Sequence, residues 1–161
     1  SSGPNTTSRA REITMHLRKL GNSDLTVSAI GLGCMSMSGT YGKSDDVESI
    51  AVVHQALDLG MNFIDSSDMY GWGHNEELLG RALKGRRDQV VLTTKFGQVQ
   101  SPDGKGNLVD GRPEYVGRAC DMSLTRLGVE VKRVLAAHRL GDLLEGCGRR
   151  VRIVAGEVPE G

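Results

Sequence analysis

The chain has 161 residues, 38% of them hydrophobic, and its 20 basic residues balance its 20 acidic ones. That length suits one domain with a real core, and the balanced charge gives no reason to expect nucleic acid as a partner. No apolar run approaches the roughly 20 residues of a membrane span, so no membrane is expected. Cys34, Cys120 and Cys147 are widely spaced and odd in number, which argues against a disulfide framework and for a reducing, cytoplasmic location. No Cys/His cluster points to a metal.

The order of elements along the chain begins with residues 1–12, which are expected to form a flexible leader before a single domain over 13–161. A hairpin is predicted over 13–28, where "GNSD" supplies turn residues between two short alternating runs. Strands are then predicted at 29–33, 61–65, 88–97 and 129–140, helices at 44–60, 75–85 and 112–128, and a helical stub with a fifth strand within 143–158.

The ends of the predicted helices carry recognisable residues. Asp45, followed three residues later by an acid, and Asn75 are expected to be N-caps. Gly60 and Gly128 suit the left-handed position after a helix, and Pro113 suits the first helical position.

Strand and helix alternate from residue 29 onward, which predicts an α/β fold with a parallel sheet. An open doubly wound sheet and a closed barrel share this alternation. The stretch "GLGCMS" lacks the third glycine of the dinucleotide fingerprint, which disfavours the open sheet. Polar residues instead follow successive strands, at Asp65, Lys95 and His138, and strand ends form one common face in a barrel. A barrel-type arrangement is therefore preferred.

The residues at these strand ends suggest proton transfer. Tyr70 lies on the loop after Asp65, and a neighbouring ammonium such as that of Lys95 favours the phenolate form of a tyrosine. A carboxylate can hold the lysine, and a neutral histidine, His138, can hydrogen-bond a carbonyl oxygen. Such a set suits protonation of an oxyanion as a hydride arrives at the carbonyl carbon.

Four stretches of the chain resemble aldo-keto reductases in the order that family uses them. They are "GLGCMSMSGTYG", "GMNFIDSSDMYGWGHNEELLGRAL", "VVLTTKFG" and "RPEYVGRACDMSLTRLGVE". The resemblance covers roughly residues 13–140, and the "FIDSSDMYG…NEELLG" block is the most specific part of it.

The resemblance implies a (β/α)8 barrel, with the hairpin as a cap on its bottom, that reduces small carbonyl compounds with NADPH. It implies a catalytic tetrad with Asp65, Tyr70 as general acid, Lys95 and His138. It also implies cofactor contacts at Gly33, Met35 and Asp65. Trp72 is expected either to line a substrate pocket or to pack on the loop.

The C-terminal part of the chain departs from that family. A (β/α)8 barrel needs about 250 residues, whereas only residues 139–161 follow His138. Lys132 and Arg133 stand in the predicted fourth strand, where an unpaired buried cation is costly. We therefore expect a partial barrel of about four to five β/α units. Its open edges predict self-association, for instance as a homo-oligomer that completes the half-barrel.

Two functions remain open from the sequence. One is an NADPH-dependent reductase of aldehydes or ketones, favoured by the tetrad residues. The other is a truncated relative that does not bind the cofactor and acts as a binding or assembly protein, or as a cofactor-independent acid–base catalyst. The absent cofactor-binding half favours the second.

Overall fold

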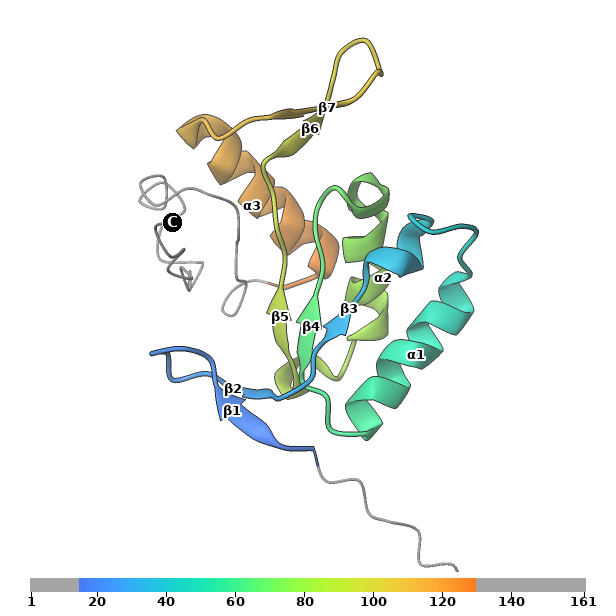
Figure 1. Ribbon diagram of the computed structural model, residues 1–161, viewed down its shortest axis with the longest axis vertical. Coiled ribbons are helices and arrows are strands. Elements are labelled where there is room, and N and C mark those ends of the chain that lie inside the picture. Colours follow the sequence, from blue (N-terminus) through green and yellow to red (C-terminus); the bar gives the residue numbers. More distant parts are fainter. Residues whose placement is uncertain (1–14, 130–161) are drawn as a thin grey trace, which may run out of the picture.

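A short parallel sheet forms the centre of the molecule in the computed structural model, which describes residues 15–129. Its strands are β3 (Leu32–Gly33), β4 (Phe63–Asp65) and β5 (Val91–Thr93), and they lie side by side in chain order (Figure 1). Parallel neighbours in chain order are what a β/α barrel requires. The strands expected at 129–140 and within 143–158 lie outside the described residues, and the described strands do not close a barrel.

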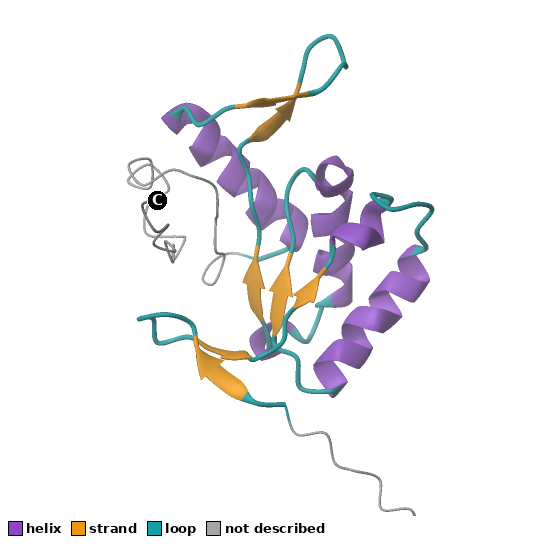
Figure 2. Cartoon of the chain, viewed as in Figure 1, coloured by secondary structure: helices purple, strands orange, loops and turns teal. Residues whose placement is uncertain are grey.

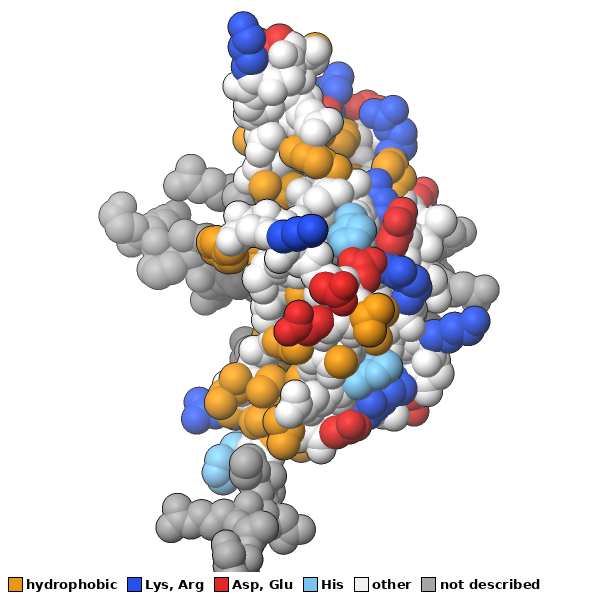
Figure 3. Space-filling model, turned by 90° about the vertical axis from the view of Figure 1, so that its right-hand side faces the viewer, with side chains coloured by type: hydrophobic (Ala, Val, Ile, Leu, Met, Phe, Trp, Pro, Cys, Tyr) orange, Lys and Arg blue, Asp and Glu red, His pale blue; other side chains and the backbone are white. Residues whose placement is uncertain are grey.

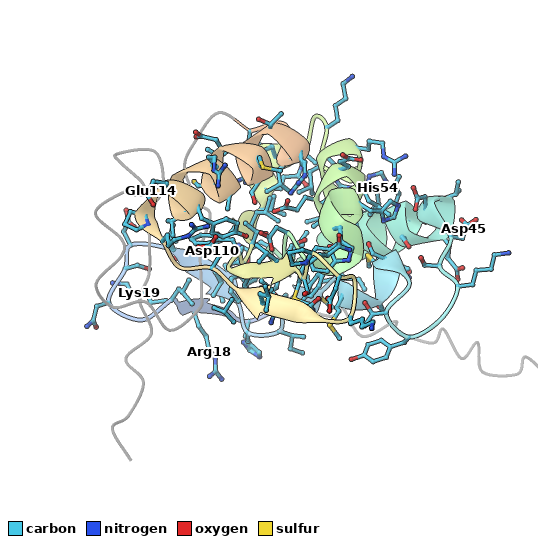
Figure 4. All side chains as sticks on the ribbon, turned by 90° about the horizontal axis from the view of Figure 1, so that it is seen from above. Arg18, Lys19, Asp45, His54, Asp110 and Glu114 are labelled. Carbon is cyan, nitrogen blue, oxygen red and sulfur yellow. The ribbon has the colours of Figure 1, made fainter. Side chains whose placement is uncertain are left out.

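The helices α1 (Asp46–Asp58), α2 (His74–Ala82) and α3 (Pro113–Leu127) pack along one side of this sheet (Figure 2). Ile64 and Leu92, partners in adjacent strands, are fully buried against the helices with Val53 and Leu78. Figure 4 shows His54 of α1 directed toward α2, where its Nε2 lies 2.8 Å from the Ala82 carbonyl oxygen. Right-handed crossovers between consecutive parallel strands place the helices on one face, which is the arrangement that a segment of a β/α barrel requires.

The ends of α1 follow the expected local rules. The Asp45 side chain accepts a hydrogen bond of 2.9 Å from the Glu48 amide and caps the helix. At the other end Gly60 has φ 85°, with hydrogen bonds from its amide to the Leu57 carbonyl and from the Met61 amide to the Ala56 carbonyl. This is the Schellman pattern, which satisfies the last carbonyls of the helix.

The predicted start of α2 was wrong. The helix begins at His74, and Gly73 at φ 100° occupies the capping position, so Asn75 does not cap it. Asn75 is instead fully buried, and its Nδ2 donates to the Cys34 carbonyl (2.7 Å) and to Ser38 Oγ (2.9 Å). The local pattern assigns Asn75 to the helix end, but its side chain instead forms hydrogen bonds to residues distant in the sequence. The α3 prediction is confirmed at both ends, by a proline at the first helical position and a left-handed glycine after the last.

Two hairpins flank the sheet. The predicted hairpin, β1 (Leu17–Lys19) with β2 (Thr26–Ser28), is confirmed at the N-terminal ends of the strands, and Figure 4 shows Arg18 and Lys19 extending outward from it. Its Leu25 and Val27 pack on Val91. A second hairpin, β6 (Gln98–Gln100) with β7 (Asn107–Val109), follows β5 and was not predicted; it rises beyond the strand ends next to α3 (Figure 1).

The two faces of the described molecule differ in character. The surface over α1 and α2 intersperses acidic, basic and hydrophobic side chains (Figure 3), including the ion pairs Asp46–Arg81 and Asp58–Arg86. The helix-free face of the sheet borders a cavity of about 430 Å³. Within residues 15–129, no helix is long and apolar enough to cross a membrane. Self-association through the helix-free face stays a prediction.

Two glycines allow α2 to lie close to the end of α3. A Cβ atom on Gly80 would stand 2.5 Å from the Arg126 carbonyl oxygen, and one on Gly73 would stand 2.5 Å from Arg126 Nε. Real Cβ atoms do not approach other atoms so closely, so a side chain at position 80 would require the backbone of α3 to shift, and one at position 73 would require the Arg126 side chain to move. By contrast, a Cβ on Gly117, within α3, would meet nothing within 4 Å.

We predict opposite effects for two helical glycine-to-alanine substitutions. Gly80→Ala should lower the free energy of unfolding by about 1–3 kcal/mol, because the added methyl group overpacks the contact with α3. Gly117→Ala should raise it by about 0.5–1 kcal/mol, because alanine loses less backbone entropy in a helix and has room. Urea denaturation monitored by circular dichroism measures both. A Gly80→Ala protein as stable as the unmodified chain would contradict the packing argument.

Candidate active site

An ion pair at the C-terminal ends of β4 and β5 forms the centre of the candidate site. Asp65 ends β4, Lys95 follows β5 by two residues, and the Lys95 ammonium lies 2.5 Å from Asp65 Oδ2. The same ammonium donates to the Ser66 carbonyl at 2.8 Å. The Lys95 ammonium has three N–H donors. Two of them are used by these bonds, which leaves one N–H donor when only the described residues are considered. The two side chains are partly exposed, so the pair faces the solvent-accessible end of the sheet.

Thr93 holds the carboxylate from its other side. Its hydroxyl donates to Asp65 Oδ1 at 2.7 Å, and the two residues are register partners in β4 and β5. Thr93 and Lys95 are two residues apart, so they point to the same face of an extended chain. The two-residue spacing from Lys95 was the feature of the sequence that could have identified Thr93 as part of the site. The hydrogen bond between Thr93 and Asp65, however, depends on strand register, which the sequence alone does not indicate.

Tyr70 completes the described part of the predicted tetrad. It begins a short 3-10 helix, Tyr70–Gly73, and the Lys95 ammonium lies 5.3 Å from the centre of its ring. That distance is within the range at which a cation is attracted to an aromatic face. The structure therefore brings Asp65, Tyr70 and Lys95 together, while His138 lies outside the described residues.

The predicted cofactor positions Gly33 and Met35 lie at the end of β3. Gly33 is the register partner of Asp65, both border the cavity on the helix-free face, and a Cβ on Gly33 would meet nothing within 4 Å. Met35 begins the following 3-10 helix, Met35–Ser38, and is half-buried. Among residues 15–129, no group of three or more His, Cys, Asp or Glu side chains is placed to hold a metal ion.

Cys34 lies between these two positions and is fully buried. Burial raises the pKa of its thiol to about 12, and the nearby Asp65 carboxylate adds to the increase while Lys95 opposes it. A thiol with such a pKa is not a nucleophile near neutral pH.

Trp72 does not border the same cavity as Asp65. It lines a second cavity of about 250 Å³, which also has Asp68 and Tyr115 in its wall. Trp72 is 42% exposed and has φ 52°, an uncommon backbone conformation for a residue other than glycine. The expectation that it touches substrate stays a prediction.

Asp68 was not identified from the sequence, although it stands within the same motif as Tyr70. Its Oδ2 accepts a long hydrogen bond of 3.4 Å from the Tyr115 hydroxyl, and its Oδ1 is buried without a partner among the described residues. Burial, and then the nearby Glu76 carboxylate, raise the pKa of Asp68 from 3.8 to about 6. A perturbed carboxyl group beside a cavity is a candidate functional group.

The geometry agrees with comparisons to known proteins. The sequence model described as "Aldo/keto reductase family" matches residues 29–143. The chain belongs to the aldo/keto reductase family.

Two curated proteins to which the chain is similar illustrate the relationship. The protein named aldo-keto reductase yakc [NADP(+)], from Schizosaccharomyces pombe, is 45% identical over 124 residues, which cover 76% of this chain and 36% of that protein. The uncharacterized oxidoreductase YqkF of Bacillus subtilis is 39% identical over 124 residues, covering 77% of this chain and 39% of that protein. The chain thus spans less than two-fifths of the length of these relatives.

Solved aldo-keto reductase structures match the described fold. The holo form of AKR11C1 from Bacillus halodurans superposes with a TM-score of 0.70 at 33% identity, over 83% of this chain and 44% of that one. An aldo-keto reductase from Klebsiella pneumoniae in complex with NADPH gives a TM-score of 0.60 at 26% identity, over 80% and 45% of the two chains. The described residues therefore match part of the aldo-keto reductase structures.

We predict that Asp68→Asn stabilises the protein at neutral and alkaline pH. A carboxyl group whose folded pKa is raised stabilises the fold when protonated, and this contribution is lost as pH rises from about 4 through about 6. Above that window the ionised group destabilises, and the asparagine should relieve about 1 kcal/mol, a value discounted for solvent reaching this half-buried side chain. Urea denaturation at several pH values measures the difference.

The matched control is Glu77→Gln, which removes an exposed acid on α2. Its free energy of unfolding should stay within a few tenths of a kcal/mol of the unmodified protein at every pH. A gain for Asp68→Asn that is equally large at about pH 4 would show that the buried charge is not its cause.

Proposed function

We propose that this chain acts as an NADPH-dependent reductase that converts an aldehyde or ketone to an alcohol. The observation that carries the proposal is the contact of the Lys95 ammonium with both the Asp65 carboxylate and the Tyr70 ring. Family membership supports it, as does the naming of NADP(+) or NADPH for two of the similar proteins.

The described residues fit one end of the proposed cofactor. Gly33 presents bare backbone to the open cavity beside Asp65, which leaves room for a flat ring close to the ion pair. Gly33, Met35 and Asp65 would hold that nicotinamide end, and NADPH supplies a hydride to the carbonyl carbon when it is bound. Residues for the phosphate groups of the cofactor are not assigned among the described ones.

Proton donation falls to Tyr70 in this proposal. As the carbonyl π bond breaks, the developing oxyanion takes the proton from Tyr70 Oη, leaving a phenolate. The Lys95 ammonium stabilises that negative charge, and Asp65, held by Thr93, keeps the ammonium in place. His138 lies outside the described residues. The family resemblance assigns it the role of orienting the carbonyl oxygen.

Binding of the cofactor is the first test of the reductase proposal. Titration of the full chain with NADPH, followed by cofactor fluorescence, should give saturable binding below high micromolar concentration. No binding in that range would reject the reductase proposal and favour a binding or assembly role, or acid–base chemistry without a cofactor.

We predict that Tyr70→Phe lowers kcat/KM by about 100-fold or more while NADPH binding is retained, because only the proton donor is lost. The assay follows NADPH absorbance with a panel of aromatic and aliphatic aldehydes. Tyr41→Phe is the matched control, since Tyr41 is 77% exposed, and it should keep its rate within about twofold. Full turnover in the Tyr70→Phe protein would remove Tyr70 from the acid role.

A further inference from the structure

Trp72 lines a pocket that is separate from the Asp65–Lys95 pair. It lies between the β6–β7 hairpin, α3 and the turn that carries Tyr70, and it measures about 250 Å³. Trp72, Val99, Tyr115 and Met122 supply most of its apolar wall. An engineered cavity of about 150 Å³ accommodates benzene, so this volume suits one ring with a short side chain.

One carboxylate oxygen of this pocket lacks a partner. Asp68 borders the cavity, and its Oδ1 is buried with no hydrogen bond to any residue within 15–129. Its Oδ2 accepts the long, 3.4 Å hydrogen bond from the Tyr115 hydroxyl, and the Met69 amide also interacts with the carboxylate. Oδ1 has almost no accessible surface, so a ligand in the pocket meets this carboxylate through its negative charge and not through a new hydrogen bond to Oδ1.

The charged groups around Asp68 indicate which charge a ligand in this pocket should carry. Arg126 also borders the pocket, but its Nη1 is paired at 3.0 Å with Oε2 of the fully buried Glu76. That pair is neutral overall, and Glu76 raises the pKa of Asp68 whereas Arg126 lowers it less. When Asp68 is ionised, the local net charge is negative. A cation fits such a site better than a neutral molecule or an anion.

The aromatic walls add to this preference. Trp72 and Tyr115 border the pocket from two different elements, and a cation held near aromatic faces gains attraction from their ring quadrupoles. Trp72 is kept at φ 52° in the turn. Strained backbone of this kind tends to occur where a side chain must be held in a functional position.

We propose that this pocket binds a small organic ammonium ion with an aromatic or compact apolar body, the ammonium lying beside the negatively charged Asp68 carboxylate. The ring occupies the space between Trp72 and the apolar side chains of β6 and α3. The site uses neither Tyr70 nor Lys95, so it goes beyond the reductase proposal and does not require NADPH.

The test uses the full chain and benzylammonium as the probe. Trp72 is the single tryptophan of the sequence, so its fluorescence reports directly on this pocket. Benzylammonium should change that fluorescence in a saturable way, with heat exchange at the same midpoint in isothermal titration calorimetry. Benzyl alcohol, a neutral probe of similar shape, should bind at least tenfold more weakly, and benzoate should not bind in the same range.

Variants decide whether Asp68 is the anchor. Asp68→Asn should weaken benzylammonium at least tenfold, and its thermal unfolding by circular dichroism shows that it is folded. Glu77→Gln should bind within about twofold of the unmodified chain. Equal affinity of the Asp68→Asn and unmodified proteins would overturn the proposal. So would equal affinity for benzylammonium and benzyl alcohol, or no saturation at about 10 mM, a concentration at which even binding of about −3 kcal/mol is detectable.

Discussion

The buried carboxylate of Glu76 is the constraint on which the described structure depends. Its side chain is fully buried, and its two oxygens accept from Thr94 at 2.7 Å and Arg126 at 3.0 Å. A buried charge is tolerated only when it is paired and hydrogen-bonded. Arg126 therefore has to approach α2, and the glycines at 73 and 80 provide the space. Helix α2, helix α3 and the end of β5 are joined at this one group.

The candidate active site lies next to this junction. Thr94 and Lys95 are consecutive, so the residue that satisfies Glu76 precedes the residue that pairs with Asp65. Their side chains point to opposite faces of the extended chain, one to the helices and one to the helix-free side. Lys95, the lysine of the proposed site, is thereby positioned by a neighbour that is fixed in the core. The same buried charge also makes ionisation of Asp68 less favourable.

The local sequence pattern predicted much of this arrangement. The features that it did not predict depend on contacts between residues far apart in the sequence. The alternation of strands and helices, the cap of α1 and the grouping of Asp65 with Lys95 follow from periodicity and from parallel strand ends. The role of Asn75 did not, because its partners are more than 30 residues away at Cys34 and Ser38. Hairpin β6–β7 and the roles of Thr93 and Asp68 likewise depend on register and burial, which spacing alone does not encode.

The burial of Cys34 has a consequence for reactions with electrophiles. Aldehydes and quinones combine with thiolates, and a reactive sulfur beside a carbonyl-binding site would be modified by such compounds. Cys34 follows Gly33 at the end of β3, yet it has no exposed surface, and the pKa of its thiol is about 12. The Asp65 carboxylate lies close enough to Cys34 to raise the pKa of its thiol further. Electrophiles that enter the proposed site therefore meet no exposed thiolate at Cys34.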